Sequence, residues 1–155
     1  MEIKLYPNRP VPEEILALLL EADPSKERVE TYLPITELYL AKENDLLIGL
    51  FALFIDRDFL VAEILNISVA QAFQNQGYGT LLMKGAIEKC REQGVKELKL
   101  GTGNSSINQL YFYQKCGFEM THILPNHFLE AYDEPIWENG IQCKHMVRFK
   151  MEITG

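Results

Sequence analysis

The chain has 155 residues, enough for one domain that buries most of its apolar surface, and its formal net charge is −7. With 47% apolar and 24% charged residues it has the composition of an ordinary folded protein, so we expect one globular domain over residues 1–155. The negative charge and the absence of any lysine or arginine cluster exclude nucleic acid as an expected partner, whereas a cationic amine would be attracted.

The first half of the chain predicts a strand, two helices and an antiparallel meander of three strands. Apolar residues in EEILALLLEA recur with helical spacing, and SKERVETYL predicts a second, shorter helix. The apolar residues then alternate, and Asn44-Asp45 is expected to form a tight turn between two strands. The third strand is apolar on both faces and therefore central. The expected elements are strand 3–6, helices 13–22 and 25–33, and strands 36–40, 46–55 and 59–69.

The third strand of the meander leads into a polar loop, which ends at Gly77 and Gly79 and opens an amphipathic helix. This helix, residues 77–93, carries apolar residues at i, i+3, i+4 and i+7, and Gly94 is expected to end it in a left-handed conformation. The free N–H groups and positive dipole end of a helix form an anion site, and residues without a Cβ let backbone approach a ligand. We therefore expect a phosphate-bearing ligand at residues 74–80.

Two familiar phosphate-binding motifs do not fit this loop. The dinucleotide fingerprint G-x-G-x-x-G needs glycine two residues before Gly77 or three after Gly79, and Asn75 and Leu82 occupy these positions. The Walker motif needs a lysine directly after its second glycine, and the first lysine after the loop is Lys84. The loop is therefore of another kind.

The second half of the chain predicts a strand, a helix and two closing strands. A long segment, residues 125–143, lies between the closing strands and exceeds an ordinary connection in length. Because it contains Phe128, Tyr132 and Trp137, it is too apolar for disorder, and we expect a packed flap without regular structure, either over the substrate side of the ligand site or at a subunit contact. The expected elements are strand 95–101, helix 107–115 and strands 118–124 and 144–152.

The loop Gln74-x-x-Gly77-x-Gly79 resembles the acyl-CoA pyrophosphate loop of the GNAT superfamily of N-acetyltransferases. The segment Tyr113-Gln114-Lys115-Cys116-Gly117-Phe118 is similar to the Y-x-K-x-G-F ending of that family's last helix. The resemblance covers residues 46–118. It implies an α/β (α+β) fold, with a mixed, mostly antiparallel sheet that parts near Val69, helices on both faces, and acetyl-CoA as co-substrate in the gap.

The resemblance also implies how the cofactor is held. Main-chain groups of Ile67 and Val69 would hold the pantetheine arm, and the Val69 N–H would polarise the thioester carbonyl. Since Gln74 and Gln76 are neutral where the family often carries arginine at the first position, pyrophosphate binding would depend on backbone donors and the helix dipole. The implied cofactor-binding residues are Ile67, Val69, Gln74, Asn75, Gln76, Gly77, Tyr78, Gly79, Thr80, Ser106, Asn108 and Tyr113.

One position departs from the family pattern. The family commonly has an asparagine seven residues before the motif tyrosine, and this chain has Ser106 there, with Asn104 and Asn108 two residues to either side. We expect Asn108 to bond the pantetheine, with Ser106 as the alternative. A helix N-cap role is equally open for Asn104, Ser105 or Ser106.

The place of Tyr113 in the Y-x-K-x-G-F ending matches the family's general acid, and a phenol with a pKa of about 10 can give its proton to a departing thiolate of similar basicity. Glu63 on the central strand is the expected general base. The alternative bases are Glu119, His127, Asp133 and Glu134. Direct attack of the amine without an acyl-enzyme is expected. His122 and His127 lack the spacing of a metal site, so we expect no metal.

The amino-terminal residues, MEIKLYPNRPVPEEI, lack a basic region followed by an apolar core, and so do not resemble a signal peptide. The longest apolar run, residues 46–55, is about half a membrane span.

The three cysteines form no C-x-x-C pair and are expected to be small buried residues in a reducing compartment: Cys90, Cys116 and Cys143. We therefore expect a cytoplasmic protein that does not contact a membrane.

The expected function is acetyl-CoA-dependent N-acetylation of a primary amine on a small molecule or peptide. One alternative is a non-catalytic module that senses acyl-CoA, against which the presence of Gly77 and Tyr113 argues. The other is an enzyme of the same fold with a different acyl group or a hydroxyl acceptor. The sequence leaves open the acceptor, the acyl-chain preference and a homodimer.

Overall fold

The computed structural model describes residues 1–155 and divides into two compact units. The first unit comprises Met1–Lys96 together with Ile153–Gly155, and the second comprises Glu97–Glu152. The helices and strands of the first unit are β1 (Glu2–Leu5), α1 (Glu13–Ala22), α2 (Lys26–Tyr32), β2 (Glu37–Glu43), β3 (Leu46–Asp56), β4 (Val61–Val69) and α3 (Tyr78–Glu92), with short 3-10 helices at Leu33–Ile35 and Gln71–Phe73.

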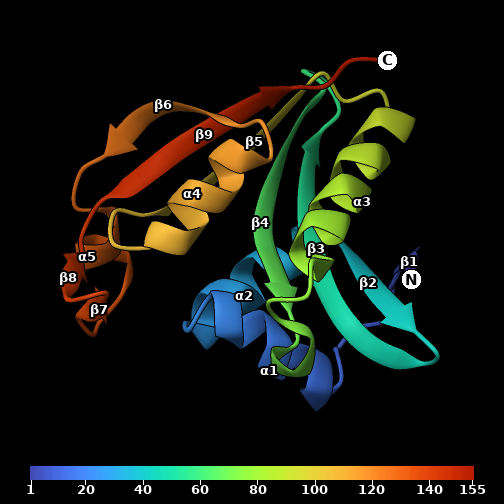
Figure 1. The fold of residues 1–155 in the computed structure, drawn as a ribbon, viewed down its shortest axis with the longest axis horizontal. Coiled ribbons are helices and arrows are strands. Elements are labelled where there is room, and N and C mark those ends of the chain that lie inside the picture. The colour runs from blue at the N-terminus through green and yellow to red at the C-terminus, as the bar shows by residue number, and fades with distance from the viewer. The chain divides into compact units, whose positions relative to one another are not determined.

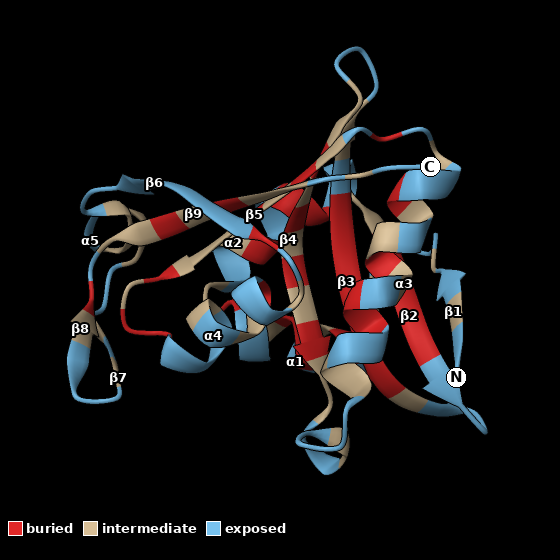
Figure 2. Cartoon of the chain, turned by 45° about the horizontal axis from the view of Figure 1, so that its top comes forward, coloured by how far each residue is buried: buried red, intermediate tan, exposed pale blue.

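The strands of the first unit form an antiparallel sheet in the order β1-β2-β3-β4, which confirms the predicted meander. Helices α1 and α2 pack on one face, where they bury Leu19 and Val29 against apolar side chains of β2 and β3. Helix α3 packs on the other face (Figure 1). There Gly85 leaves room for Ile3 of β1 and lies close to Phe51 of β3. Strand β3 is the most continuously buried strand, as Figure 2 shows.

A buried amide connects α1 and α2 to β4. Asn66 is only 4% exposed, and its Nδ2 donates to the carbonyl oxygen of Leu19 at 2.8 Å and to the hydroxyl of Tyr32 at 2.9 Å. Burial, with hydrogen bonding to Asp23 as a smaller contribution in the same direction, raises the pKa of Tyr32 to about 12. Asp23 in turn accepts from the Ser25 N–H at the start of α2. These contacts fix the corner between α1 and α2 against the strand.

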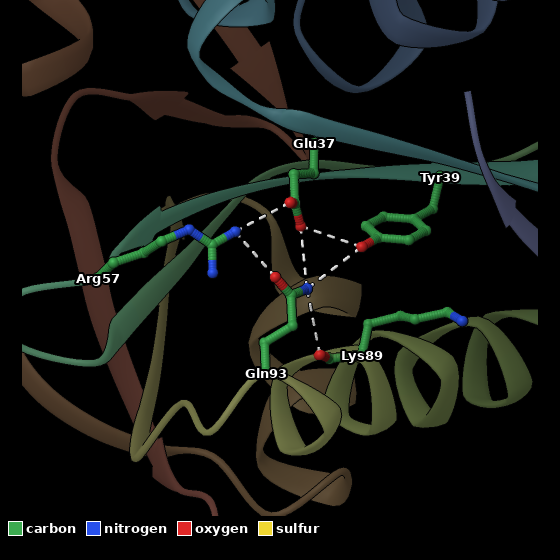
Figure 3. A network of polar contacts seen from close by, with 5 residues as sticks. All are labelled: Glu37, Tyr39, Arg57, Lys89 and Gln93. Carbon is green, nitrogen blue, oxygen red and sulfur yellow. Dashed lines mark hydrogen bonds and ion pairs between the residues drawn. The ribbon is translucent and has the colours of Figure 1, made fainter. Parts of the chain in front are cut away.

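A second polar network anchors the carboxyl end of α3 (Figure 3). The side chain of Gln93 donates to Glu37 at 3.0 Å and to the Tyr39 hydroxyl at 3.3 Å, and it accepts from Arg57 at 2.9 Å. Arg57 also pairs with Glu37 at 3.1 Å. The helix end is therefore bonded to β2 and to the turn that follows β3. The pKa of Tyr39 is raised, mainly by burial and then by its hydrogen bond to Glu37.

The second unit contains a three-stranded antiparallel sheet in the order β5-β9-β6 and a separate hairpin, β7-β8. Strand β6 is exposed along its whole length (Figure 2). The elements of this unit are β5 (Glu97–Gly103), α4 (Ile107–Lys115), β6 (Glu119–Leu124), α5 (His127–Ala131), β7 (Ile136–Glu138), β8 (Ile141–Cys143) and β9 (Met146–Glu152).

The segment 125–143 is where the structure differs most from the sequence-based expectation, because it is not irregular. It contains the short helix α5 and the hairpin β7-β8. The hairpin turns at Asn139-Gly140, both with positive φ, as a two-residue turn of this type requires. The expectation was wrong because strands of three residues are too short to show a period-two pattern.

Three strands begin two residues later than expected: β4, β5 and β9, the last of which begins at Met146 rather than at residue 144. Strand β4 begins at Val61 rather than at residue 59, because Leu60 has φ 56° and belongs to the preceding turn. Strand β5 begins at Glu97 rather than at residue 95, since the Val95 N–H still bonds the last turn of α3 at the Cys90 carbonyl.

All three cysteines are free, and two of them, Cys90 and Cys143, are buried as expected, while Cys116 is partly exposed. None of the helices combines the length and apolar character that crossing a membrane requires.

Candidate active site

At the carboxyl end of β4, the N–H and C=O groups of every second residue point away from β3. The Ala70 N–H donates to the Ile48 carbonyl at 2.7 Å, which makes these residues a hydrogen-bonded antiparallel pair. In the register of the two strands Val69 then lies opposite Gly49 in a non-bonded pair, and Ile67 lies opposite Phe51 in the next one. The N–H and C=O groups of Ile67 and Val69 therefore point away from β3.

A β-bulge interrupts β4 just before these residues. Asn66 pairs with Ala52 and Ile64 pairs with Leu53, so Leu65 is an extra residue on β4. Glu63, the predicted base, lies beyond the bulge opposite Phe54 and is partly buried. The bulge bends the strand between Glu63 and the outward-facing main chain at its end.

The loop after β4 is exposed but held in place by its own side chains. The Gln74 amide donates to the Val69 carbonyl and the Gln76 amide donates to the Ala72 carbonyl, both at 3.0 Å. The Phe73 ring meets the Tyr78 ring edge-on, with centroids 5.6 Å apart. Because side chains already bond the loop internally, its backbone shape is defined without a ligand.

Helix α3 begins at this loop with its first N–H groups unpaired within the helix. Gly77 is its N-cap, has φ 87° and makes no side-chain cap bond. The N–H groups of Tyr78, Gly79 and Thr80 follow, and the first four N–H groups of a helix have no intrahelical acceptor. The Tyr78 hydroxyl donates to Glu43 at 2.9 Å, which ties the helix start to the end of β2. The structure thus brings together the predicted residues 74–80 at a helix amino terminus.

No charged side chain occurs in residues 71–80, whose sequence is QAFQNQGYGT. Attraction for an anion at this position therefore comes from backbone N–H groups and the helix dipole.

In the second unit, Tyr113 lies in the last turn of α4 and is 7% exposed. Its ring packs edge-on against Phe118 and Phe149, with centroids 6.1 and 5.7 Å away. Burial raises the pKa of Tyr113 to about 12. The phenol is therefore protonated throughout the physiological range, as a proton donor must be.

The three polar residues around the start of α4 have different partners. Ser106 occupies the N-cap position without a side-chain cap bond, and its hydroxyl donates to Glu138 at 2.8 Å. Asn104 accepts from the N–H groups of Lys144 and His145 at 2.8 and 2.9 Å. Asn108 is exposed on the first turn of α4. Of these residues, Asn108 is therefore the one whose side chain is turned to solvent.

Glu138 was not singled out from the sequence. It lies at the end of β7 and accepts from both Ser105 and Ser106. Asn139 in the same hairpin donates to the Ser105 carbonyl at 2.8 Å. The segment 125–143 is thus bonded to the residues that precede α4, a pairing with no local sequence signal.

The remaining candidate bases differ in exposure. His127 is partly buried in α5, with its ring edge-on to Phe128. Glu119, Asp133 and Glu134 are exposed. Glu63 is the only one of the candidate carboxylates that is partly buried.

The comparison with protein families gives one decisive match, because a model of the acetyltransferase (GNAT) family matches residues 8–118. The chain belongs to this family. The family and the enzyme class predicted from the two motifs are thereby confirmed.

Relatives of this GNAT acetyltransferase support the assignment. The Bacillus subtilis protein YvbK, named as an uncharacterized N-acetyltransferase, is 47% identical over 141 residues, which cover 91% of this chain and 90% of that protein. A Bacillus subtilis acetyltransferase solved in complex with CoA has a TM-score of 0.90 and 44% identity, and covers 98% of each chain. A GNAT family acetyltransferase from Elizabethkingia anophelis, solved with acetyl-CoA bound, has a TM-score of 0.90 and 49% identity over 97% of each chain. These likenesses over nearly the whole chain confirm the predicted GNAT fold.

Proposed function

We propose that this GNAT acetyltransferase moves the acetyl group of acetyl-CoA to a primary amine of a small molecule or peptide, and that residues 1–155 act as one N-acetyltransferase domain. The observation that carries the proposal is the presence of outward main-chain donors at two places, the end of β4 and the start of α3. Val69 turns its N–H away from β3, and the loop presents uncharged N–H groups at the helix start. The solved relatives that hold CoA and acetyl-CoA support acetyl-CoA as the source of the acetyl group.

In the proposed reaction the amine nitrogen attacks the thioester carbonyl carbon, and the carbon–sulfur bond breaks. The Val69 N–H stabilises the developing negative charge on the carbonyl oxygen. Tyr113 gives its proton to the departing thiolate, and Glu63 takes the proton that the amine loses. The N–H groups of residues 76–80 bind the pyrophosphate, while Ile67 and Asn108 bind the pantetheine arm.

The base matters because a free ammonium group cannot attack. A lysine-like amine with a pKa of about 10.4 is neutral at pH 7 in only about one molecule in 2,500, which costs about 4 to 5 kcal/mol. An α-amino group with a pKa near 8 costs only about 1 kcal/mol, so water suffices for it. A Glu63→Gln variant should therefore lose activity mainly toward lysine-like acceptors. The net charge of −7 favours approach of such cationic amines.

The test combines binding and turnover. Calorimetry with CoA should show saturable binding to the full chain, and release of free thiol from acetyl-CoA should depend on a panel of primary amines. CoA binding without thiol release for any amine would instead indicate an acyl-CoA-sensing module. Competition between acetyl-CoA and longer acyl-CoAs then defines the acyl group, and hydroxyl acceptors in the same panel test the remaining alternative.

A further inference from the structure

The peptide groups on either side of Val69 are fixed by their neighbours. The Gln74 amide donates to the Val69 carbonyl at 3.0 Å, and the next N–H in the chain, that of Ala70, donates to the Ile48 carbonyl at 2.7 Å. The peptide that follows Val69 is thus bonded at both its oxygen and its nitrogen. One of these two bonds belongs to the strand pairing, and the other comes from a side chain of the loop.

Without the hydrogen bond from Gln74, the Val69 carbonyl oxygen would be free to accept a hydrogen bond from a ligand. Because Val69 is in a non-bonded pair with β3, its C=O and its N–H both point away from β3. With the C=O bonded to Gln74, the outward main-chain group that Val69 offers to a ligand is its N–H donor. That is the polarity which a developing oxyanion requires.

The preceding peptide is restrained by close packing. A Cβ on Gly49 would lie 2.6 Å from the Ser68 carbonyl oxygen, a distance at which something must shift. The Ser68 C=O and the Val69 N–H belong to the same planar peptide unit, so a change in one reorients the other. With any other residue at position 49, this peptide or the facing backbone of β3 would have to shift.

We propose that Gln74 is a positioning residue, which holds the Val69 carbonyl so that the Val69 N–H is aimed as a fixed donor, with Gly49 supporting the same peptide from β3. The inference rests on the proposed function, since it gives the Val69 N–H its role at the thioester. It assigns to the Gln74 side chain a task in the chemical step rather than a contact with the pyrophosphate. A donor held in place before the reaction requires no reorganisation in the transition state.

The chain offers a matched pair of variants for the test. Gln74 and Gln76 are both exposed loop glutamines, and each donates to a main-chain carbonyl at 3.0 Å, but only Gln74 bonds Val69. Methionine has a similar length and no donor. Gln74→Met should lower kcat about tenfold or more, the low end of the loss when one oxyanion donor is removed, and should change the KM for acetyl-CoA less. Gln76→Met should do the opposite, raising KM and leaving kcat within about twofold.

A third variant tests the chemical cause. Gln74→Arg retains N–H donors at this position, so it should restore most of kcat, whereas a role based on the shape of the side chain alone would leave it as impaired as Gln74→Met. The proposal is overturned if Gln74→Met leaves kcat unchanged, or if both methionine variants alter KM alone.

Hydrogen exchange gives a readout that does not need catalysis. In the ligand-free protein the Ala70 amide should exchange faster in Gln74→Met than in the wild type, and its rate should be unchanged in Gln76→Met. If the wild-type protein turns over no acetyl-CoA with any amine, the proposed function fails, but this comparison still decides whether Gln74 holds the peptide. Equal Ala70 exchange rates in all three proteins would refute the positioning role.

Discussion

The side-chain amide of Asn66 lies 2.9 Å from the hydroxyl of Tyr32, which joins the middle of β4 to the last turn of α2 across an apolar core. The same amide donates to Leu19 at the end of α1. Asn66 therefore fixes the ends of α1 and α2 against β4, the strand that ends at the proposed donor Val69.

Replacing Asn66 with alanine should destabilise the fold. The change leaves the Leu19 carbonyl and the Tyr32 hydroxyl without a buried donor, and we expect a loss of about 2 to 3 kcal/mol in the free energy of unfolding. Tyr32→Phe should cost about 1 kcal/mol, because it removes only the hydroxyl. Urea denaturation of both variants and of the double variant measures the coupling. Losses that add fully would show that the two groups do not interact.

Alanine variants of Gly77 and Gly94 separate the effect of backbone strain on stability from an effect on ligand binding. Both flank α3 with positive φ, 87° and 74°, and a Cβ at either would meet no atom within 4 Å. Alanine at either position should therefore cost about 1 to 2 kcal/mol of stability from the left-handed backbone alone. Only Gly77→Ala should also weaken acetyl-CoA binding in calorimetry, because it changes the loop at the helix start. An equal loss of affinity in Gly94→Ala would argue against the anion site.

Removal of the Tyr113 hydroxyl should affect catalysis more than binding. Tyr113→Phe should lower kcat by about a hundredfold or more, the usual worth of a general acid, and leave the affinity for CoA nearly unchanged. Tyr111→Phe is the matched control on the same helix, since Tyr111 is 64% exposed and two residues away. An unchanged kcat in Tyr113→Phe would end its assignment as proton donor.

The buried phenols predict a loss of stability at high pH. The pKa values of Tyr32 and Tyr113 are raised to about 12 by burial, above the value of about 10 expected in the unfolded chain. The folded state therefore favours their protonated forms, and this stabilisation is complete below pH 10 and is lost as the pH rises toward 12. For Tyr113 the effect is on the order of 2 kcal/mol.

Denaturant titrations between pH 9 and about pH 12, followed by tyrosinate absorbance, measure this loss. The Tyr113→Phe variant should lose less stability over the same interval than the wild type, whereas Tyr111→Phe should behave as the wild type does. Identical pH dependence in all three proteins would contradict the raised pKa of Tyr113.

Acetyl-CoA affinity should depend only weakly on salt. Residues 71–80 carry no charged side chain, so the pyrophosphate is bound by dipoles whose effect ionic strength screens little at contact distance. Calorimetry from low to moderate salt should give a shallow slope, and Gln76→Arg, which adds a charge to the loop, should make it steeper. A steep loss of affinity in the wild type would show that charged side chains elsewhere dominate binding.

In the candidate site, patterns in consecutive residues predicted the ends of a helix but not a contact between distant segments. Gly77 and Gly94 were placed correctly at the two ends of α3. Glycine favours the positive φ found at both positions, and the apolar period changes on either side of the helix, so neighbouring residues were sufficient for this prediction. The hairpin β7-β8 was missed, and its anchor Glu138 bonds Ser106 across 32 positions of the chain. No pattern in consecutive residues reports a contact of that kind.

By itself the sequence determined the order and type of nearly all the helices and strands, the uncharged glycine loop and the motif tyrosine, because periodicity, turn residues and short motifs act over a few neighbouring positions. The tertiary structure decided which backbone groups face outward and what holds them. The alternation at Val69 depends on strand register, the space at Gly49 depends on Ser68 of the adjacent strand, and the position of Tyr32 depends on Asn66. Each of these is a distance between residues far apart in the chain, and such a distance is defined only when the packed core brings them together.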